Sequence, residues 1–386
     1  MHCLTSCGSS RLTLIVKIDT VLLRQINITN FKNIASAKLE FSDKLNCFLG
    51  DNGMGKSNVL DAIYYLSFCR SFTGVNDSLI VRKGEDFTLL QASYLRHNAV
   101  EDINLSIGKN RRKSLKRSGK EYTRLSNHIG LFPAVLVSPA DMDLVTGAGE
   151  VRRRFMDMVI SQGNAEYLDA LIKYNSALDN RNKLLRSDIR DTALFQAYET
   201  AMDRYGNIVT EGRRRFVDEL SVIHQKYYNA ITSGPEITEL RFSSQMDGDP
   251  DGSLINILDH RRDRDRMLGF TSAGPHRDDL EMTLAGMPLR RTASQGQSKT
   301  YTIALRLAQY DFLAKTTGLK PLLLLDDIFD KLDSRRVENI IALVTDTHFG
   351  QIFITDTNRK HLDEIISNRA DAQCLWTVTD GHFVHQ

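Results

Sequence analysis

One eight-residue segment constrains the fold more than any other feature of the 386 residues. It has the pattern G-x-x-x-x-G-K-S and reads Gly50-Asp51-Asn52-Gly53-Met54-Gly55-Lys56-Ser57. The glycines allow the backbone N–H groups to point at a β-phosphate. Lys56 supplies a cation to the β- and γ-phosphate oxygens, and Ser57 offers a hydroxyl to Mg²⁺. The segment therefore predicts a loop that binds ATP together with Mg²⁺.

The residues on both sides of this loop suit that interpretation. An apolar run at residues 45–49 predicts a buried strand, and Val59, Leu60 and Ile63 have the spacing of an amphipathic helix after the loop. Such a helix presents its N-terminus to the phosphates, so Asn58 is counted with the nucleotide-binding residues. The alternative, an ordinary glycine turn, does not account for the strand and the helix together.

A second nucleotide element is predicted far downstream, where the apolar run 321–325 ends in Asp326 and Asp327. In P-loop proteins the first acid holds Mg²⁺ through water, and the second orients the attacking water. Lys56, Asp326 and Asp327 are thus the candidate catalytic residues, and Ser57 with Asp326 the candidate metal ligands. The alternative is a strand followed by an aspartate that caps a turn or helix.

The 270 residues between Lys56 and Asp326 are too many for a compact single-lobed nucleotide-binding domain. We therefore expect an insertion that separates two halves of one ATP-binding head. Strand-like runs fill residues 21–150, residues 151–260 are expected to be a mostly helical arm, and residues 261–386 return to mixed strands and helices. Residues 1–20 are expected to be an extension of doubtful order. In the arm, Leu171, Leu178 and Leu185 recur every seven residues, with Leu168 and Ile172 beside them. This predicts two helices of ~35 residues, each about 50 Å long.

The cysteines and the apolar runs indicate in which cellular compartment the protein is expected to work. Five scattered cysteines without a C-x-x-C pair predict neither a disulfide framework nor a zinc module, and favour a reducing cytoplasm. Cys47 and Trp376 are expected in the core. No stretch of 18 apolar residues is present, so we expect no membrane span and no membrane partner.

The formal charge of +2 hides a strongly basic segment at residues 109–124, which has eight Lys or Arg against the single acid Glu121. That is +7, which leaves −5 for the rest of the chain. We expect a hairpin there that binds nucleic-acid phosphates. The candidate DNA-binding residues are Lys109, Arg111, Arg112, Lys113, Lys116 and Arg117. The alternative is an edge strand protected by its charges against aggregation.

The remaining basic clusters are less informative. The arginines at 152–154 and 213–215 are typical of solvated helix faces, and those at 261–266 alternate with aspartates and are expected to pair locally. His276-Arg277 is expected to form a structural turn, although it could approach the nucleotide or a partner head.

Ser294-Gln295-Gly296-Gln297 opens a predicted helix whose apolar face runs through Ile303, Leu307 and Tyr310. Ser294 and Gln297 fit a capping box, so a well-capped helix is one explanation. The segment also resembles the signature loop of ABC-type ATPases, and residues 330–333 resemble the D-loop. This resemblance implies that residues 294–297 contact the γ-phosphate held by an opposite protomer, so that ATP joins two heads in a homodimer.

Further segments narrow the resemblance to the bacterial RecF family. They are Asn30-Phe31-Lys32-Asn33, Arg70-Ser71-Phe72, Ser138-Pro139-Ala140-Asp141, Arg152 to Asp157, and Gly274 to Asp279. The resemblance covers the chain from Val21 to the C-terminus. It implies an α/β fold, namely an ABC/SMC-like P-loop ATPase head with an inserted helical arm. It also implies a weak ATPase that binds duplex DNA and single-strand/duplex junctions. RecO and RecR are the implied partners in loading RecA at single-strand gaps.

Several positions depart from related ATPases. Ala293 stands where leucine is commoner, Thr355-Asp356 replaces the switch histidine of transporters, and no Q-loop glutamine is found near 138–141. Asp327 is one methylene shorter than glutamate, which predicts slow turnover and a DNA-stimulated switch. The alternatives are the nucleotide-binding subunit of a membrane transporter and an SMC-like chromosome- or nuclease-associated ATPase. Against them stand the missing histidine, the short arm and the missing C-x-x-C hook.

Overall fold

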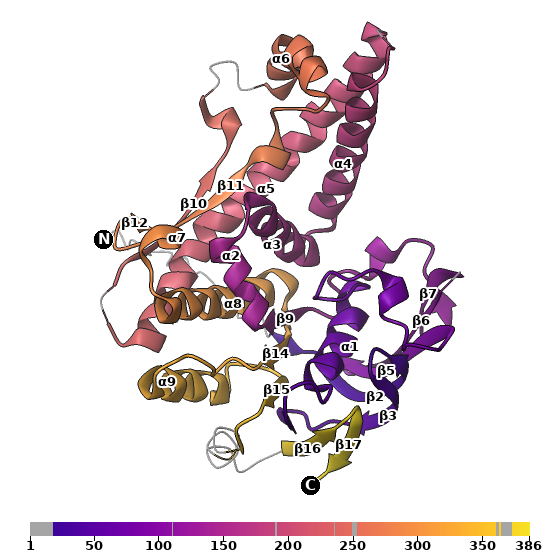
Figure 1. Cartoon of the computed structure of the whole chain (residues 1–386), viewed down its shortest axis with the longest axis vertical. Coiled ribbons are helices and arrows are strands. Elements are labelled where there is room, and N and C mark those ends of the chain that lie inside the picture. Colours follow the sequence, from indigo (N-terminus) through magenta and orange to yellow (C-terminus); the bar gives the residue numbers. More distant parts are fainter. Residues whose placement is uncertain are drawn as a thin grey trace, which may run out of the picture.

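The computed structural model describes residues 18–109, 111–189, 191–234, 236–248, 253–359, 363 and 373–386. A wide head contains the strands, and a long helical arm projects from it (Figure 1). Residues 1–17 of the expected extension lie outside the described residues. Its last residues, Asp19–Thr20, form β1, which pairs in parallel with β13 (Leu319–Lys320).

A six-stranded sheet in the order β17-β16-β4-β15-β14-β9 forms the centre of the head. All neighbours are parallel except β16 and β17. Strand β14 reads LLLLD and is buried along its whole length, as expected for a parallel strand covered on both faces. The pairing places the ends of β4, β15 and β14 side by side. The bounds are β4 Leu45–Leu49, β9 Ala134–Val137, β14 Leu322–Asp326, β15 Ile352–Asp356, β16 Gln373–Thr379 and β17 His382–His385.

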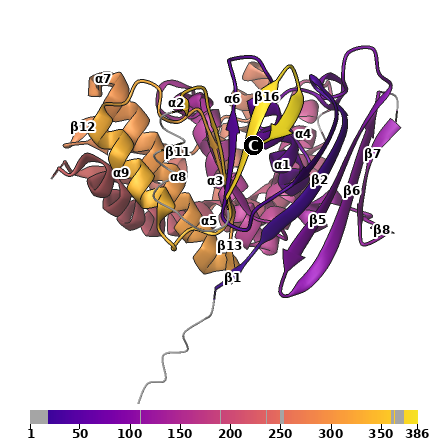
Figure 2. The same cartoon turned by 90° about the horizontal axis from the view of Figure 1, so that it is seen from below.

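An antiparallel sheet in the order β3-β2-β5-β6-β7-β8 curves around α1 (Lys56–Phe68) (Figure 2). Its strands alternate buried and exposed residues, because one face packs on the core and the other faces water. The basic segment forms the expected hairpin, since β6 pairs with β7. The bounds are β2 Leu22–Phe31, β3 Ile34–Glu40, β5 Phe87–Arg96, β6 Ala99–Gly108, β7 Arg111–Arg117 and β8 Lys120–Glu121.

The arm consists mainly of α4 (Ala165–Leu185), α5 (Thr192–Thr232) and α6 (Leu254–Leu268). The prediction of two helices of ~35 residues is wrong, because α4 has 21 residues and α5 has 41. Side chains explain these limits. Asn164 accepts a hydrogen bond from the Tyr167 N–H at the start of α4, and Asp191 accepts from two N–H groups at the start of α5.

Of the leucines of the expected heptad, only Leu185 belongs to the buried face of α4. Leu171 and Leu178 are only partly buried, and Ile172 is 50% exposed. The buried residues lie one position away, at Tyr167, Ala170, Tyr174, Ala177, Arg181, Leu184 and Leu185. The burial period is helical as predicted, but the buried face was assigned to the wrong residues.

The lower half of α5 belongs to the same hydrophobic core as the central sheet. Phe216, Val217 and Leu220 of α5 join a core cluster with Leu305 of α8 and Leu323 of β14. A second cluster lies between α1 and the antiparallel sheet. The arm therefore continues into the head without a break in packing, and the expected limits at residues 150 and 260 stay predictions.

The remaining elements surround these layers. A small sheet, β10-β11-β12, packs along α5, and the described helices include none that is long and apolar enough to cross a membrane. Cys47 and Trp376 are buried, as predicted. The bounds are α2 Met142–Thr146, α3 Gly149–Gly163, α7 Leu289–Thr292, α8 Gln295–Thr317, α9 Ser334–Thr345, β10 Thr238–Ser243, β11 Asp279–Leu284 and β12 Met287–Pro288. The short 3-10 helices are η1 Asp77–Leu79, η2 Leu125–His128, η3 Pro139–Asp141, η4 Gln245–Gly248 and η5 Pro275–Arg277.

Candidate nucleotide-binding site

The loop at residues 50–55 joins β4 to α1, and two of its glycines are required by close contacts. A Cβ atom at Gly50 would lie 2.4 Å from the Val378 carbonyl oxygen. At Gly55, which has a left-handed φ of 108°, a Cβ would lie 2.8 Å from the Asn33 side chain. The loop is therefore wrapped tightly enough for its N–H groups to surround an anion at the start of α1.

Lys56 and Ser57 follow the loop at the start of α1. The Lys56 Nζ donates to the carbonyl oxygens of Gly50 at 2.7 Å and Asp51 at 2.9 Å, so the lysine folds back over the loop. The Ser57 Oγ donates to the Asp326 Oδ1 at 2.8 Å. The structure thus brings together two candidate residues that are 269 positions apart, because β15 places the end of β14 next to the end of β4.

Acidic groups crowd this edge of the sheet. Asp326 is almost fully buried, and its Oδ1 also accepts from the Thr355 Oγ1 at 2.7 Å. Burial raises the pKa of Asp326, and neighbouring Asp327 adds to the effect. Burial also raises the pKa of Asp327, with further contributions from Asp356 and Asp330. Hydroxyl and carboxylate oxygens are the ligands that Mg²⁺ prefers, so Ser57 and Asp326 fit the predicted metal site.

Lys56 is the cation among these acids. Burial lowers its pKa, and the charges of Asp327, Asp326 and Asp356 oppose that effect. Asp327 itself has a left-handed φ of 48°, and its N–H donates to the Thr355 carbonyl oxygen at 3.2 Å. This backbone turn directs the chain away from β14 and leaves the Asp327 side chain partly exposed.

The predicted signature segment forms the expected capping box at the start of α8. The Ser294 Oγ accepts from the Gln297 N–H at 3.1 Å, and the Gln297 Oε1 accepts from the Ser294 N–H at 3.0 Å. Ser294 and Gln295 are exposed, and Gly296 and Gln297 are partly buried. In the described part of the chain, no hydrogen bond or ion pair joins residues 294–297 to residues 50–58.

Gln297 also connects the signature segment to the long arm helix. Its Nε2 donates to the Glu236 Oε1 at 3.0 Å, and the Tyr228 hydroxyl of α5 donates to the Glu236 Oε2 at 2.8 Å. On the next turn of α8, the Lys299 ammonium donates to the Asp330 carbonyl oxygen in the predicted D-loop. Gln297 of the signature segment therefore contacts Glu236, which bonds to α5, and Lys299, two residues further along α8, contacts the loop after β14.

Two supports of the phosphate loop were missed by the sequence interpretation. The Asn33 Nδ2 donates to the Met54 carbonyl oxygen at 3.3 Å, and its Oδ1 accepts from the Asn58 Nδ2 at 2.7 Å. The Gly381 N–H donates to the same Met54 oxygen at 2.8 Å. Asn33 stood in a segment noted only for its family resemblance, and the turn at 380–381 carries no motif.

The predicted DNA-binding residues of the hairpin do not form one exposed surface. Leu115 is buried, and residues alternate along a strand, so Lys113 and Arg117 lie on the same inward side. Lys113 is only 14% exposed, pairs with Asp77 at 2.9 Å and lies 4.9 Å from the Tyr65 ring centre. Arg117 pairs with Glu101. Lys113 is therefore not part of an exposed surface, and DNA contact by the hairpin stays a prediction.

The remaining candidate DNA-binding residues of the hairpin face outward. Lys109, Arg112 and Lys116 are exposed and have no ion-pair partner within the described chain. The Arg111 side chain lies outside the described residues, although its backbone begins β7.

The arginines at 213–215 are not all solvated, contrary to prediction. Arg213 is almost fully buried, and its guanidinium binds both carboxylate oxygens of Asp157 at 2.9 Å and the Asp278 Oδ2 at 3.1 Å. His276, in the η5 turn, contacts the Tyr174 hydroxyl at 2.7 Å and the Thr271 carbonyl oxygen at 2.9 Å. It therefore helps to hold this turn against α4. The turn at 275–277 is confirmed as structural. Arg213 of α5 links α3, through Asp157, to the end of this turn, through Asp278.

Comparison with known proteins agrees with this geometry. The family profile described as "RecF/RecN/SMC N terminal domain" matches residues 22–373. The protein called DNA replication and repair protein RecF from Parabacteroides distasonis is 49% identical over 361 residues, with 94% of this chain and 98% of that protein covered. The protein of the same name from Bacteroides thetaiotaomicron is 46% identical over 363 residues, with 94% and 98% covered.

Solved structures show the same fold. A structure of the recombination mediator protein RecF-ATP in the RecFOR pathway has a TM-score of 0.85 at 27% identity, covering 95% of this chain and 98% of that one. The Smc head domain of Pyrococcus furiosus, solved with an extended coiled coil and bound to ScpA, has a TM-score of 0.57 at 17% identity, covering 95% and 96%. The second likeness concerns the fold alone.

Proposed function

Because the chain belongs to the RecF family of DNA replication and repair proteins, we propose that it is an ATP-gated clamp on DNA. Residues 50–58 would bind ATP, and the signature of one protomer would cover the ATP of another. The observation that carries the proposal is the hydrogen bond from Ser57 to Asp326, which joins the phosphate loop to the acidic end of β14 at 2.8 Å.

ATP binding is supported by the tight glycine loop and by the RecF-ATP structure with the same fold. Mg²⁺ would be held by Ser57 and Asp326, whose oxygens already lie within hydrogen-bond distance. When bound, the ion supplies positive charge to the β- and γ-phosphates. Lys56 would exchange its two carbonyl acceptors for phosphate oxygens, which are stronger partners because they are charged.

Dimerisation follows from the exposed position of Ser294 and Gln295 at the N-terminus of a 23-residue helix. That end offers free N–H groups and a partial positive charge to an anion, while nothing in its own chain contacts it from the phosphate loop. A second copy would bring its nucleotide there. Light scattering with ATP and Mg²⁺ should show a dimer that Lys56→Ala and Ser294→Arg both prevent. A monomer at every protein and ATP concentration would refute the clamp.

Hydrolysis is proposed to be slow and to reopen the dimer. Asp327 reaches less far than glutamate would. Burial raises its pKa, and neighbouring acids, whose repulsion a bound cation would relieve, raise it further. A steady-state rate below about 10 s⁻¹, the median for enzymes, is expected without DNA. The most informative measurement is whether duplex or gapped DNA changes this rate, because a fast rate without DNA would contradict a switch.

DNA contact is proposed for the exposed hairpin residues Lys109, Arg112 and Lys116. Replacing the three by glutamate should weaken duplex binding and flatten its dependence on salt, because fewer counterions are released. ATP binding should stay unchanged. The matched control replaces Lys183, Arg215 and Arg264, which are three exposed basic residues of the arm, by glutamate. Equal loss in both sets would mean that only net charge matters and that the hairpin is no DNA site.

The family also supports a place in the RecFOR pathway, with RecO and RecR as partners in loading RecA at single-strand gaps in the cytoplasm. Co-sedimentation of the purified proteins on gapped DNA, with and without ATP, tests this assignment. A transporter subunit and a chromosome-organising ATPase receive no support from the comparisons.

A further inference from the structure

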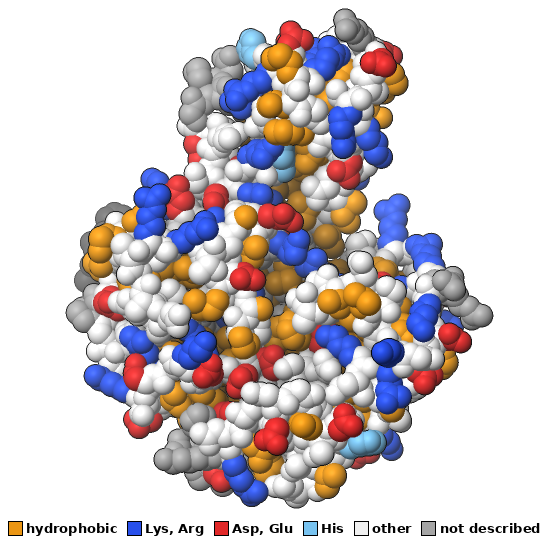
Figure 3. Space-filling view, viewed as in Figure 1, with side chains coloured by type: hydrophobic (Ala, Val, Ile, Leu, Met, Phe, Trp, Pro, Cys, Tyr) orange, Lys and Arg blue, Asp and Glu red, His pale blue; other side chains and the backbone are white. Residues whose placement is uncertain are grey.

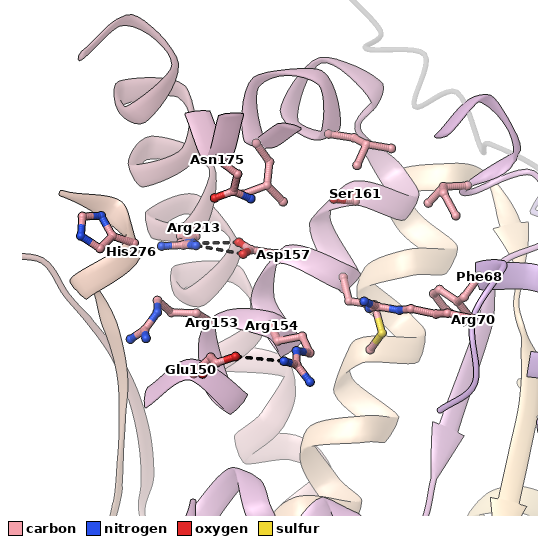
Figure 4. Close-up of a pocket in the computed structure, with 14 residues that line it drawn as sticks. Phe68, Arg70, Glu150, Arg153, Arg154, Asp157, Ser161, Asn175, Arg213 and His276 are labelled. Carbon is pink, nitrogen blue, oxygen red and sulfur yellow. Dashed lines mark hydrogen bonds and ion pairs between the residues drawn. The ribbon is translucent and has the colours of Figure 1, made fainter. Parts of the chain in front are cut away.

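A cleft of about 470 Å³ lies where the arm meets the head, and it belongs neither to the nucleotide site nor to the basic hairpin. Its lining comes from the end of α1 with Arg70, from Ile129, from α3, from the side of α4, and from Arg213 of α5 and His276 of the η5 turn (Figure 4). In the space-filling view, hydrophobic side chains line a hollow beside the arm, with basic side chains around it (Figure 3).

The apolar part of the cleft contains the α4 side chains that sequence periodicity assigned to the core. Leu168 and Leu171 line the cleft, and Ile172, one residue further, is 50% exposed. Met158 of α3 and Ile129 complete an apolar floor. Partly buried apolar groups gathered in a concave site, with an exposed isoleucine beside them, are typical of a binding site, because a chain without a partner gains nothing by leaving them accessible.

The polar part of the cleft carries net positive charge. Its lining contains four arginines against Glu150 and Asp157, which is a formal +2. Arg213 and Asp157 compensate each other, and Arg154 pairs with Glu150 at 3.0 Å. Arg153 donates to the Asp278 carbonyl oxygen at 2.7 Å, and the carboxylates of Asp279, Asp278 and Glu150 lie close enough to act on its charge. Arg70 is exposed and has no hydrogen-bond or ion-pair partner among the residues that the structure describes.

His276 does not add to this charge at neutral pH. Burial lowers its pKa to about 4, and the nearby Arg277 and Arg153 also disfavour the charged form. Its ring is already engaged by Tyr174 and Thr271. The cation of the lining that has no ion-pair partner among the described residues is therefore Arg70, at the edge of the apolar floor.

We propose that this cleft binds a segment of a partner protein that presents an apolar side chain between acidic residues. The apolar side chain would cover Leu168 and Leu171 and extend to the neighbouring exposed Ile172, and a carboxylate would pair with Arg70. A DNA backbone suits the cleft less well, because it offers no apolar group for the floor and its phosphates would meet Glu150 and Asp157. The proposal does not depend on ATP or on the DNA clamp.

The probe is a phage library of random dodecapeptides, selected on the full-length protein and then resynthesised with a fluorescent label. Enriched sequences should share an apolar residue flanked by Asp or Glu. Fluorescence polarisation should then show at least a tenfold loss of affinity, equal to about 1.4 kcal/mol, in Ile172→Glu. Arg70→Glu should lower the affinity at least threefold.

Matched controls separate the cleft from general surface effects. Ile189, at the other end of the arm, is also 50% exposed, so Ile189→Glu introduces the same change away from the cleft. Arg215→Glu does the same for an exposed arginine. Both controls should bind the peptide within twofold of the unmodified protein, and circular dichroism should be equal for all four variants.

Three results would overturn the proposal. The library could give no enriched family, or the peptides could bind the Ile172→Glu variant as tightly as the unmodified protein. Alternatively, Ile172→Glu and Arg70→Glu could weaken duplex DNA binding in place of peptide binding, which would make the cleft a nucleic-acid site. Because Lys56→Ala leaves the cleft intact, it should bind the peptide normally even if the ATP clamp fails.

Discussion

In the arm, the fully buried Arg181 guanidinium lies between two buried carboxylates, with its Nε 3.0 Å from Glu199 and its Nη1 2.8 Å from Asp265. Arg262 adds a second cation to Glu199. At the nucleotide site, by contrast, Asp326 and Asp327 are crowded by further acids, and their pKa values are raised. The arm compensates its buried charges internally, whereas the head leaves negative charge for a cation that arrives with the ligand.

The buried charges of the arm fix the geometry of its helices, whereas the acids of the head are positioned to bind a cation together with the ligand. A buried pair with additional hydrogen bonds fixes a geometry but is strongly destabilising once one partner is removed. A crowded set of acids weakens the unliganded protein and gains its compensation on binding. The variants below test whether the two regions behave in these opposite ways.

The largest effect is expected in the arm. Arg181→Met leaves Asp265 buried without its cation, and should lower the free energy of unfolding by about 3–5 kcal/mol. Urea denaturation followed by circular dichroism measures the change. The combined variant Arg181→Met, Glu199→Gln, Asp265→Asn should recover much of the loss because no uncompensated charge remains. A loss below ~1 kcal/mol for Arg181→Met alone would show that the cluster does not hold the arm together.

A smaller effect of opposite direction is expected at the head. Asp326→Asn removes a buried negative charge beside Asp327, so the unliganded protein should become more stable. Its affinity for ATP with Mg²⁺ should fall at least tenfold, since the metal loses a charged ligand, while affinity in EDTA should change little. Thermal shift and calorimetry measure the two quantities. Destabilisation of the unliganded protein would mean that the carboxylate is structural.

The pH dependence should distinguish the head further. Because folding raises the pKa of Asp326 and Asp327 above the ordinary value of 3.8, their favourable contribution is present at low pH and is lost as pH rises through the raised values. The stability advantage of the variant Asp326→Asn, Asp327→Asn should therefore be largest near pH 7 and shrink towards pH 4. An advantage that is constant with pH would contradict this account.

The smallest effect is expected for an exposed pair. Arg215 lies 2.7 Å from Glu211 one turn earlier in α5, and its side chain is 74% exposed. Arg215→Ala should change the free energy of unfolding by less than about 1 kcal/mol, because water and salt screen the pair. Urea denaturation in low and high salt provides the measurement. A loss comparable to that of Arg181→Met would remove the distinction between buried and exposed charge.

Much of the head could be predicted because its signals are local. Residues 45–49, 134–137 and 322–326 are apolar runs that form strands with almost those limits, and the Gly50–Ser57 segment carries its geometry in its glycines. The link between the two halves was also accessible, because a phosphate loop and an acidic strand end belong to one type of site.

Other features depend on partners that no local pattern specifies. Lys113 is inward because Asp77 and Tyr65 happen to lie beneath β7, and Arg213 is buried because Asp157 and Asp278 reach it from other segments. In α4 the period was correct, but the buried face consists of tyrosines, alanines, one arginine and the last two leucines, whereas Leu168 and Leu171 line a cleft. Residue type alone therefore could not identify that face.

The long helix α5 has one more consequence. At about 1.5 Å per residue, its 41 residues form a rod of about 60 Å, and tilting the rod by only 1° displaces its far end by about 1 Å. One end holds the Arg181 cluster through Glu199, and the other reaches the signature segment through Tyr228 and Glu236. The helix is thus a lever whose two sides are of similar length and meet at the Arg213 contacts, near the middle of α5. A force applied at the arm tip and the packing of two heads around ATP would therefore both act on α5.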